Sequence, residues 1–250
     1  MIGLVRAELQ KVFTTRMVWG MLALSLGFTL IGLVVLGVFA GQQGTPPLTE
    51  PDGALTLFSQ AGSGLVFSFV IGTLLITGEY RFQTITHTFL ATPRRERVVA
   101  AKLIACAAVG AIFGLAGTLL AFAVGVPAIL IRGGSLSVIG GDVVRLCAGV
   151  VAAMALYTIL GLALGSLLRN QIAAIVIGVG WVYVLENLLV VLLPGVGKWL
   201  PGGAAQAVYG LSSPMGGDYL PAWAGAALLL GYALLFAAIA SATTIRRDIT

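Results

Sequence analysis

The polar stretch at residues 78–102 reads GEYRFQTITHTFLATPRRERVVAAK and interrupts a chain otherwise built of long apolar runs. It contains the single histidine of the chain and five of its 14 Lys and Arg residues. Apolar runs of membrane-spanning length lie on both sides of it, so we predict that it joins two membrane helices. If the protein receives force or information from a partner, we expect the contact here.

The composition defines the class of protein. Hydrophobic residues make up 59% of the chain, charged residues make up 9%, and the mean hydropathy is +1.05. Soluble domains have roughly 45–50% apolar and 25% charged residues. A chain this apolar cannot cover a water-facing surface. We therefore expect an all-α integral membrane protein with one transmembrane domain over residues 1–250.

Six apolar runs are long enough to cross a membrane, which takes about 20 residues. The expected spans are residues 17–40, 55–78, 98–131, 143–168, 171–193 and 221–245. Residues 1–16 place apolar side chains at helical spacing, which predicts an amphipathic helix in the plane of the lipid headgroups. A signal peptide is excluded because the apolar run that follows is too long for one.

The positive charges are unevenly divided between the two sides of these spans. Eleven of the 14 Lys and Arg residues fall on the side that holds both termini and the polar stretch. The other three are Arg132, Arg145 and Lys198. By the positive-inside rule, both termini are expected in the cytoplasm. The same rule accounts for the net charge of +5, so we expect no nucleic acid as a partner.

One amphiphilic loop, the two cysteines and a set of small residues give further predictions about the membrane domain. The loop at residues 194–220 has an apolar middle, Ala204–Val208, and predicts short helices that dip into the outer leaflet. Cys106 and Cys147 fall inside apolar spans and predict neither a disulfide nor a metal site. Small residues spaced for close helix contacts are Gly110, Gly114, Gly117, Ala121, Gly125, Gly161 and Gly165.

Catalytic motifs are missing from the sequence. The run Gly195–Lys198 does not have the spacing of a phosphate-binding loop. A single histidine, His87, cannot form a zinc-protease pair, and it has no serine partner at membrane depth. The chain is therefore not predicted to be an enzyme.

Glu186 is the one clear ionisable residue at membrane depth, within the run WVYVLENLLVV. In one interpretation, Glu186 and Asn187 line a cavity that meets substrate or a proton. In the other, Glu186 is structural and pairs with Arg145 or Lys198, or makes a hydrogen bond within the bundle. The sequence leaves both interpretations open.

The polar stretch itself has helical periodicity, since Phe82, Ile85 and Phe89 fall on one face. The alternation at residues 84–88 would equally suit a strand, but a strand would have no partner there. We therefore predict a short amphipathic helix on the cytoplasmic surface. Several basic residues then lie at the start of the next helix, where the helix dipole destabilises cations. Binding of anionic lipid or of an acidic partner therefore explains their position better than helix stability does.

The ordered set of motifs resembles the membrane (permease) subunits of ABC transporters of the drug- and polysaccharide-export type, the type-2 exporter permeases. The motifs before the first span are Ala7-Glu8-Leu9-x-Lys11 and Thr14-Thr15-Arg16. Those after the second span are Gly78-Glu79-Tyr80-Arg81-x-x-Thr84-Ile85, Leu90-x-x-Pro93-x-Arg95 and Ala101-Lys102. The six-span plan and the long loop between spans five and six match as well.

The resemblance implies that the segment between spans two and three is a coupling helix that docks on a separate ATPase. Two such ATPases would bind ATP and Mg²⁺, and a second permease subunit, identical or homologous, would complete the translocation path. The resemblance does not give the substrate, because it varies widely across the family; we expect export of a drug-like, lipid-like or peptide molecule. The expected coupling residues are Glu79, Tyr80, Arg81, Phe82, Thr84, Ile85, His87 and Phe89. The expected cytoplasmic-surface residues are Glu8, Lys11, Arg16, Arg94, Arg95, Arg97 and Lys102.

The alternative function is that of a six-span secondary carrier or channel in the plasma membrane that works without an ATPase. Such a protein would show several charges near the middle of the membrane or inverted halves with broken helices. The sequence shows one such charge and no convincing repeat.

Overall fold

The computed structural model describes residues 1–42, 44–82, 95–193, 195–211 and 219–247. Every regular element in these ranges is a helix, and six helical stretches are long and apolar enough to cross a membrane. The helices are α1 (Ile2–Thr14), α2 (Arg16–Phe39), α3 (Pro51–Ser59), α4 (Leu65–Arg81), α6 (Arg95–Ile131), α7 (Gly141–Leu168), α8 (Gln171–Gly180), α9 (Glu186–Leu192), α10 (Pro201–Tyr209) and α11 (Ala222–Arg247). The predicted all-α class with six candidate spans is confirmed.

The second span is longer than the predicted 55–78 and is interrupted. It begins at Pro51, because proline fits the first position of a helix. A 3₁₀ turn at Gln60–Gly62 separates α3 from α4. A Cβ on Gly62 would lie 2.6 Å from the Tyr209 hydroxyl, so the interruption coincides with a close contact to α10.

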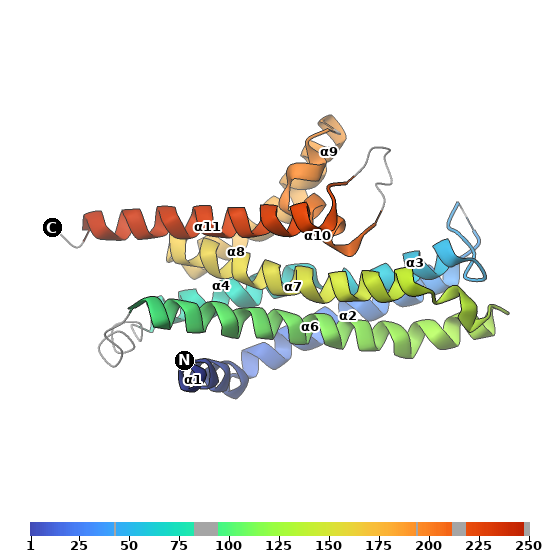
Figure 1. Ribbon diagram of the computed structural model, residues 1–250, viewed down its shortest axis with the longest axis horizontal. Helices are drawn as coiled ribbons and strands as arrows, with labels where there is room; N and C mark the ends of the chain where they lie inside the picture. The colour runs from blue at the N-terminus through green and yellow to red at the C-terminus, as the bar shows by residue number, and fades with distance from the viewer. Residues whose placement is uncertain (43, 83–94, 194, 212–218, 248–250) are drawn as a thin grey trace.

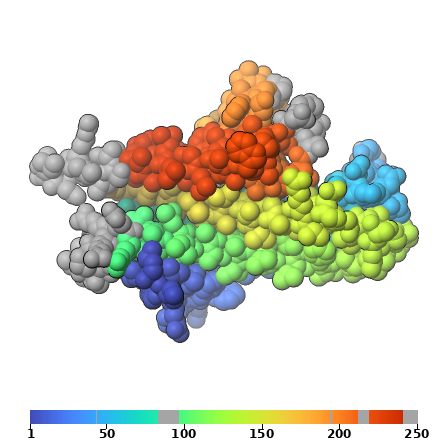
Figure 2. Space-filling view, viewed as in Figure 1, coloured from blue at the N-terminus to red at the C-terminus, as the bar shows by residue number. Residues whose placement is uncertain are grey.

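The fifth span, predicted as one helix over 171–193, changes direction midway. Five residues, Trp181–Leu185, form a π-helical turn between α8 and α9. Such a turn widens the helix locally and shifts the faces on either side of it. Beyond it, α9 stands away from the bundle (Figures 1 and 2).

Helix α7 lies in the middle of the bundle and packs against α4, α6, α10 and α11. Glycines allow its closest approach to α4, since Gly161 faces the Phe69 carbonyl and Gly72 faces the Thr158 carbonyl. The Thr73 hydroxyl donates to the Gly161 carbonyl at 3.1 Å. On the α6 side, Gly110 and Gly114 face the α7 backbone, and a Cβ on Gly114 would lie 2.7 Å from the Cα of Val151. The predicted close packing at Gly110, Gly114 and Gly161 is confirmed, and Gly72 is a further position of this kind.

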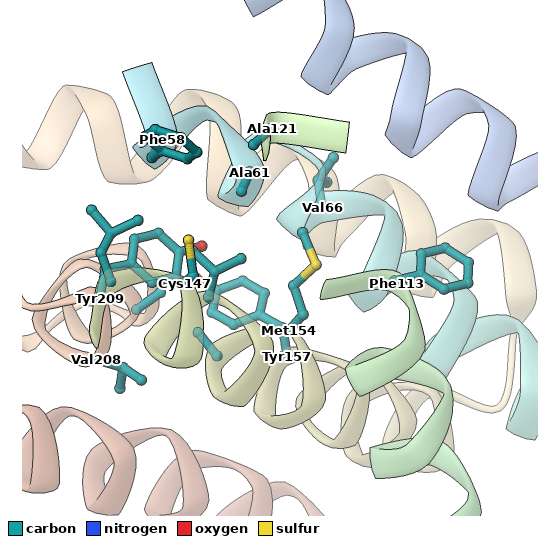
Figure 3. Packing of buried hydrophobic residues seen from close by; sticks show 14 of the residues in the cluster. Phe58, Ala61, Val66, Phe113, Ala121, Cys147, Met154, Tyr157, Val208 and Tyr209 are labelled. Atoms are coloured by element: carbon teal, nitrogen blue, oxygen red, sulfur yellow. The ribbon is translucent and has the colours of Figure 1, made fainter. Parts of the chain in front are cut away.

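Helix α10 lies between the fifth and sixth spans and packs into the bundle against α7 and α11. Ala204 and Ala205 are buried, in line with the predicted apolar middle of this segment. Val208 and Tyr209 lie near Cys147 in the core (Figure 3). This helix is therefore part of the core.

One end of the bundle collects α1, the end of α4, the start of α6 and the end of α11 (Figure 1). The predicted N-terminal helix forms over Ile2–Thr14, and the extended backbone of Thr15 separates it from α2. Helix α1 turns away from the bundle axis and packs on α6 and α2 through Leu9, Val12 and Phe13. This end carries the described part of the expected coupling residues.

Candidate functional site

A cluster of four charged residues joins three helices at this end, and we call it the charge cluster: Glu8 and Lys11 of α1, Glu79 of α4 and Lys102 of α6. The Lys102 ammonium lies 2.9 Å from Glu8 Oε2 and also bonds Glu79 Oε1. Lys11 Nζ lies 2.9 Å from Glu8 Oε1 and 3.7 Å from Glu79 Oε1. Two cations therefore share two carboxylates, and Lys102 makes the connection between all three helices.

Local sequence explains how each helix presents its charge. Glu8 and Lys11 are three residues apart, so they share one face of α1. Glu79 lies in the last turn of α4, where the helix dipole destabilises a carboxylate. A nearby cation is therefore required to stabilise its charge. The exposed fractions of the Lys102, Glu8 and Glu79 side chains are 10%, 13% and 12%, so these bonds are shielded from water.

The ionisation of Glu8 reflects two opposing effects. Burial raises the pKa of its carboxyl, but hydrogen bonds and charge from Lys102 and Lys11 lower it by more, so the net pKa lies below the ordinary 4.5. Glu8 is therefore held as a carboxylate at neutral pH. One oxygen of the cluster, Glu79 Oε2, is buried and has no hydrogen-bond partner among the described atoms.

A cavity of about 460 Å³ lies beside the charge cluster. All four charged residues line it, together with apolar side chains that include Leu74, Ile76, Cys106 and Phe82. The cluster is thus a bonded group next to an open space, at the junction of α1, α4 and α6.

The expected coupling residues divide into a described and an undescribed part. The Arg169 guanidinium lies 5.6 Å from the centre of the Tyr80 ring, and Arg81 lies at the same distance from the Phe82 ring. The Phe82 side chain is 71% exposed at the end of α4. The other expected residues, which lie outside the described part of the chain, are Thr84, Ile85, His87, Phe89 and Arg94.

The expected surface residues do not all lie at the surface. Arg16 and Arg97 are exposed, and Arg95 begins α6. Lys102, in contrast, is buried, and Glu8 is half-buried. Sequence patterns did not reveal the charge cluster, because its members come from three separate segments. The available signal was the position of three charged residues near or within apolar segments: Glu8 lies in the predicted N-terminal helix, Glu79 directly follows the second span, and Lys102 lies near the start of the third.

Glu186 is buried with an exposed fraction of 5%, at the start of α9. Its Oε2 accepts a hydrogen bond of 2.7 Å from the backbone N–H of Gly202 in the first turn of α10. Among the described residues it forms no ion pair, so a pair with Arg145 or Lys198 is absent and the hydrogen bond within the bundle is present. Asn187 is exposed, and its amide donates to the Tyr183 carbonyl at 2.9 Å.

The fold and this site define a multi-pass helical membrane protein with a bonded charge cluster at one end of its bundle. A family model described as ABC-2 family transporter protein matches residues 4–187. That match covers most of the chain, which therefore belongs to this family. A comparison with curated proteins finds no match. The chain is an ABC transporter permease, a membrane transport component that is not itself catalytic.

Proposed function

We propose that this chain is the permease subunit of an ATP-driven exporter of the plasma membrane, with both termini in the cytoplasm. Two copies of a separate ABC ATPase would bind ATP and Mg²⁺, and a second permease subunit, identical or homologous, would pair with this one. The substrate would be a drug-like, lipid-like or peptide molecule. Basic residues beside the polar stretch would hold anionic lipid.

The observation that carries this proposal is the charge cluster, because it ties together the helices on either side of residues 83–94. Glu79 ends the helix before that segment, and Lys102 lies early in the helix after it. Both bond to each other, and Lys102 also bonds Glu8. A force applied to the segment would therefore move α1, α4 and α6 as one unit.

The exposed Phe82 supports a docking role for the same end. An apolar ring at the end of α4, followed by the polar stretch, suits the groove of a partner protein better than it suits water. Closure of two ATPases on ATP would push the docked segments together. The three helices joined by the charge cluster would transmit this movement to the membrane spans. The translocation path would then change the side of the membrane to which it opens.

The test is affinity purification of the tagged chain from its native membranes. Wild-type chain should recover an ABC ATPase in a stoichiometric amount, and Phe82→Asp should recover less than about a tenth of it, because a charge would replace the buried ring of the contact. Trp223→Asp is the matched control, since Trp223 is 76% exposed at the start of α11. It should recover wild-type amounts.

Full recovery of ATPase and full transport by Phe82→Asp would contradict the docking assignment. Transport by the purified chain alone, driven by a proton gradient with no ATPase present, would establish the secondary-carrier alternative in its place.

A further inference from the structure

The cavity of about 460 Å³ beside the charge cluster changes in character along the bundle. Its charged lining residues lie at the end of the bundle. On α4, Leu75 lies one turn further into the bundle than Glu79, and on α6 the apolar lining continues one turn further in, at Cys106. Leu162 of α7 packs with Cys106 in this apolar part. The cavity is therefore polar at one end and apolar further in, along the direction in which the helices cross the membrane.

The cavity opens beside α1, at the edge of the bundle. Lys11 and Met17 both line it and are exposed. An amphipathic surface helix such as α1 lies at the boundary between lipid headgroups and acyl chains. The opening is therefore within reach of a lipid headgroup, and the apolar part extends from it toward the depth of the acyl chains. The volume lies within the roughly 300–1,000 Å³ of small-molecule sites, which accommodates part of a lipid.

The free hydrogen-bonding capacity at the polar end belongs to Lys11. Both oxygens of Glu8 are bonded, one to Lys11 and the other to Lys102. Glu79 bonds Lys102 through Oε1, and its Oε2 is buried, so it offers no accessible acceptor. The Lys11 ammonium has three N–H groups and a hydrogen bond of 2.9 Å to Glu8, while Glu79 Oε1 lies 3.7 Å away and the side chain is 53% exposed. This end of the cavity therefore suits an anionic acceptor.

We propose that the cavity binds a phospholipid, with its phosphate on the Lys11 ammonium and one acyl chain along Leu75, Cys106 and Leu162. The phosphate oxygens would accept the remaining N–H groups of Lys11, and the opposite charges strengthen such bonds. The acyl chain would cover apolar side chains at the depth where lipid chains lie. A diacylglycerol lacks the anionic group and a soluble phosphate ester lacks the chain, so neither matches both parts of the cavity.

This inference goes beyond the proposed function, because a lipid site requires neither an ATPase nor transport. The site is also separate from the basic residues at the start of α6, since neither Arg95 nor Arg97 lines the cavity. A bound lipid would touch α1, α4 and α6, the three helices that the charge cluster joins. It would therefore be a structural component of the end of the bundle at which the ATPase is proposed to dock.

Photolabelling of the full chain in a neutral maltoside detergent tests the proposal. The probes are phosphatidylglycerol with a diazirine on one acyl chain and the diacylglycerol that carries the same chain. Phosphatidylglycerol should label the peptides that contain Leu75, Cys106 and Leu162 about tenfold more strongly, the discrimination expected of one charge-assisted hydrogen bond. Equal labelling of these peptides by the two probes would overturn the proposal.

An excess of soluble glycerol phosphate distinguishes a lipid from a free phosphate ester. It should leave labelling by phosphatidylglycerol unchanged, because it lacks the acyl chain. Loss of the labelling would show that the polar end alone binds, and it would overturn the assignment of a lipid. Labelling spread evenly over the exposed apolar helices, without enrichment in the three cavity peptides, would show general lipid contact only and would overturn it as well.

Two variants and a control locate the two parts of the lipid. Lys11→Met removes the ammonium while Lys102 continues to bond the two carboxylates, and it should reduce the ratio of the two probes to about one. Leu75→Trp fills the apolar part and should abolish labelling of the cavity peptides by both probes. Arg6→Met removes an exposed cation of α1 that does not line the cavity, and it should keep the wild-type ratio.

A tenfold ratio retained by Lys11→Met would overturn the assignment of the phosphate to Lys11. The wild-type comparison of the two probes decides the matter even if a variant fails to fold. Because labelling is done without an ATPase, its failure is separate from a failure of the proposed ATP-driven function, which the recovery of ATPase by the tagged chain measures.

Discussion

At the scale of single residues, Lys102 is the cation that bonds carboxylates of two other helices. It contacts one carboxylate from α1 and one from α4, and its side chain is only 10% exposed. Removing one member of a buried ion pair leaves a charge without compensation, which costs more than the pair contributes. The stability of this end of the bundle should therefore depend on Lys102.

We predict that Lys102→Met lowers the free energy of unfolding by about 3 kcal/mol, because Glu8 and Glu79 would share only the exposed Lys11. Thermal unfolding of the purified protein in detergent measures the change. Arg97→Met, which removes an exposed cation from the same helix, should change the stability little. Equal effects of the two variants would show that the charge cluster contributes no special stability.

Glu8 makes part of this stability dependent on pH. Because the pKa of Glu8 is lowered in the folded state, its contribution is complete at neutral pH and disappears as the pH falls below 4.5 and through the lowered value. We predict that wild type is more stable than Glu8→Gln at neutral pH and that the difference shrinks on acidification. Unfolding midpoints of both proteins across acidic pH measure it, and a difference that grows on acidification would contradict the prediction.

At the scale of elements, the contact between α4 and α7 depends on glycine. A side chain on Gly161 would meet the Phe69 carbonyl, whereas a Cβ on Gly231 of α11 has no atom within 4 Å. Close approach of two membrane helices maximises dispersion contacts, since water supplies little driving force inside the bilayer. The absence of a side chain is therefore needed for close helix packing at Gly161 but not at Gly231.

We predict that Gly161→Ala destabilises the protein by about 1–3 kcal/mol through overpacking. Gly231→Ala should leave stability unchanged or raise it by up to about 1 kcal/mol, because alanine is the better helix former. Resistance to unfolding in a denaturing detergent compares the two variants. A stable Gly161→Ala protein would mean that α4 and α7 can separate without loss.

The π-helical turn at Trp181–Leu185 is the second feature at this scale. It allows Glu186 to face α10 while α8 continues to pack on α4. Hydrophobic periodicity gave no sign of this turn, because the residues from Ile172 to Leu185 include no charged or amide side chain that would mark one face of the helix.

At the scale of the whole molecule, both described ends of the chain come together with the charge cluster at one end of the bundle (Figure 1). We predict that a cysteine in place of Gly3, which is exposed in α1, reacts with an impermeant maleimide only after the membrane is opened. A cysteine in place of the exposed Asp52, at the opposite end, should react in intact cells. The native Cys106 and Cys147 are buried and provide an unreactive background. The reverse labelling pattern would invert the proposed orientation.

The membrane class and the number of spans could be predicted from the sequence because hydropathy is summed along a continuous run of residues. The same holds for the N-terminal helix and for the glycine contacts, which depend on spacing within one helix. The motifs that carried the family resemblance likewise lie within short segments. The family match over residues 4–187 agrees with them.

The pairing of polar groups between helices was decided by the tertiary structure alone. Glu8 and Lys102 are 94 positions apart in the sequence, and their ion pair exists because α1 packs on α6. Glu186 likewise meets the backbone of Gly202 only after α10 folds back into the bundle. Electrostatic and hydrogen-bond energies depend on distances of a few ångströms between separate helices, and no local pattern in the chain records those distances.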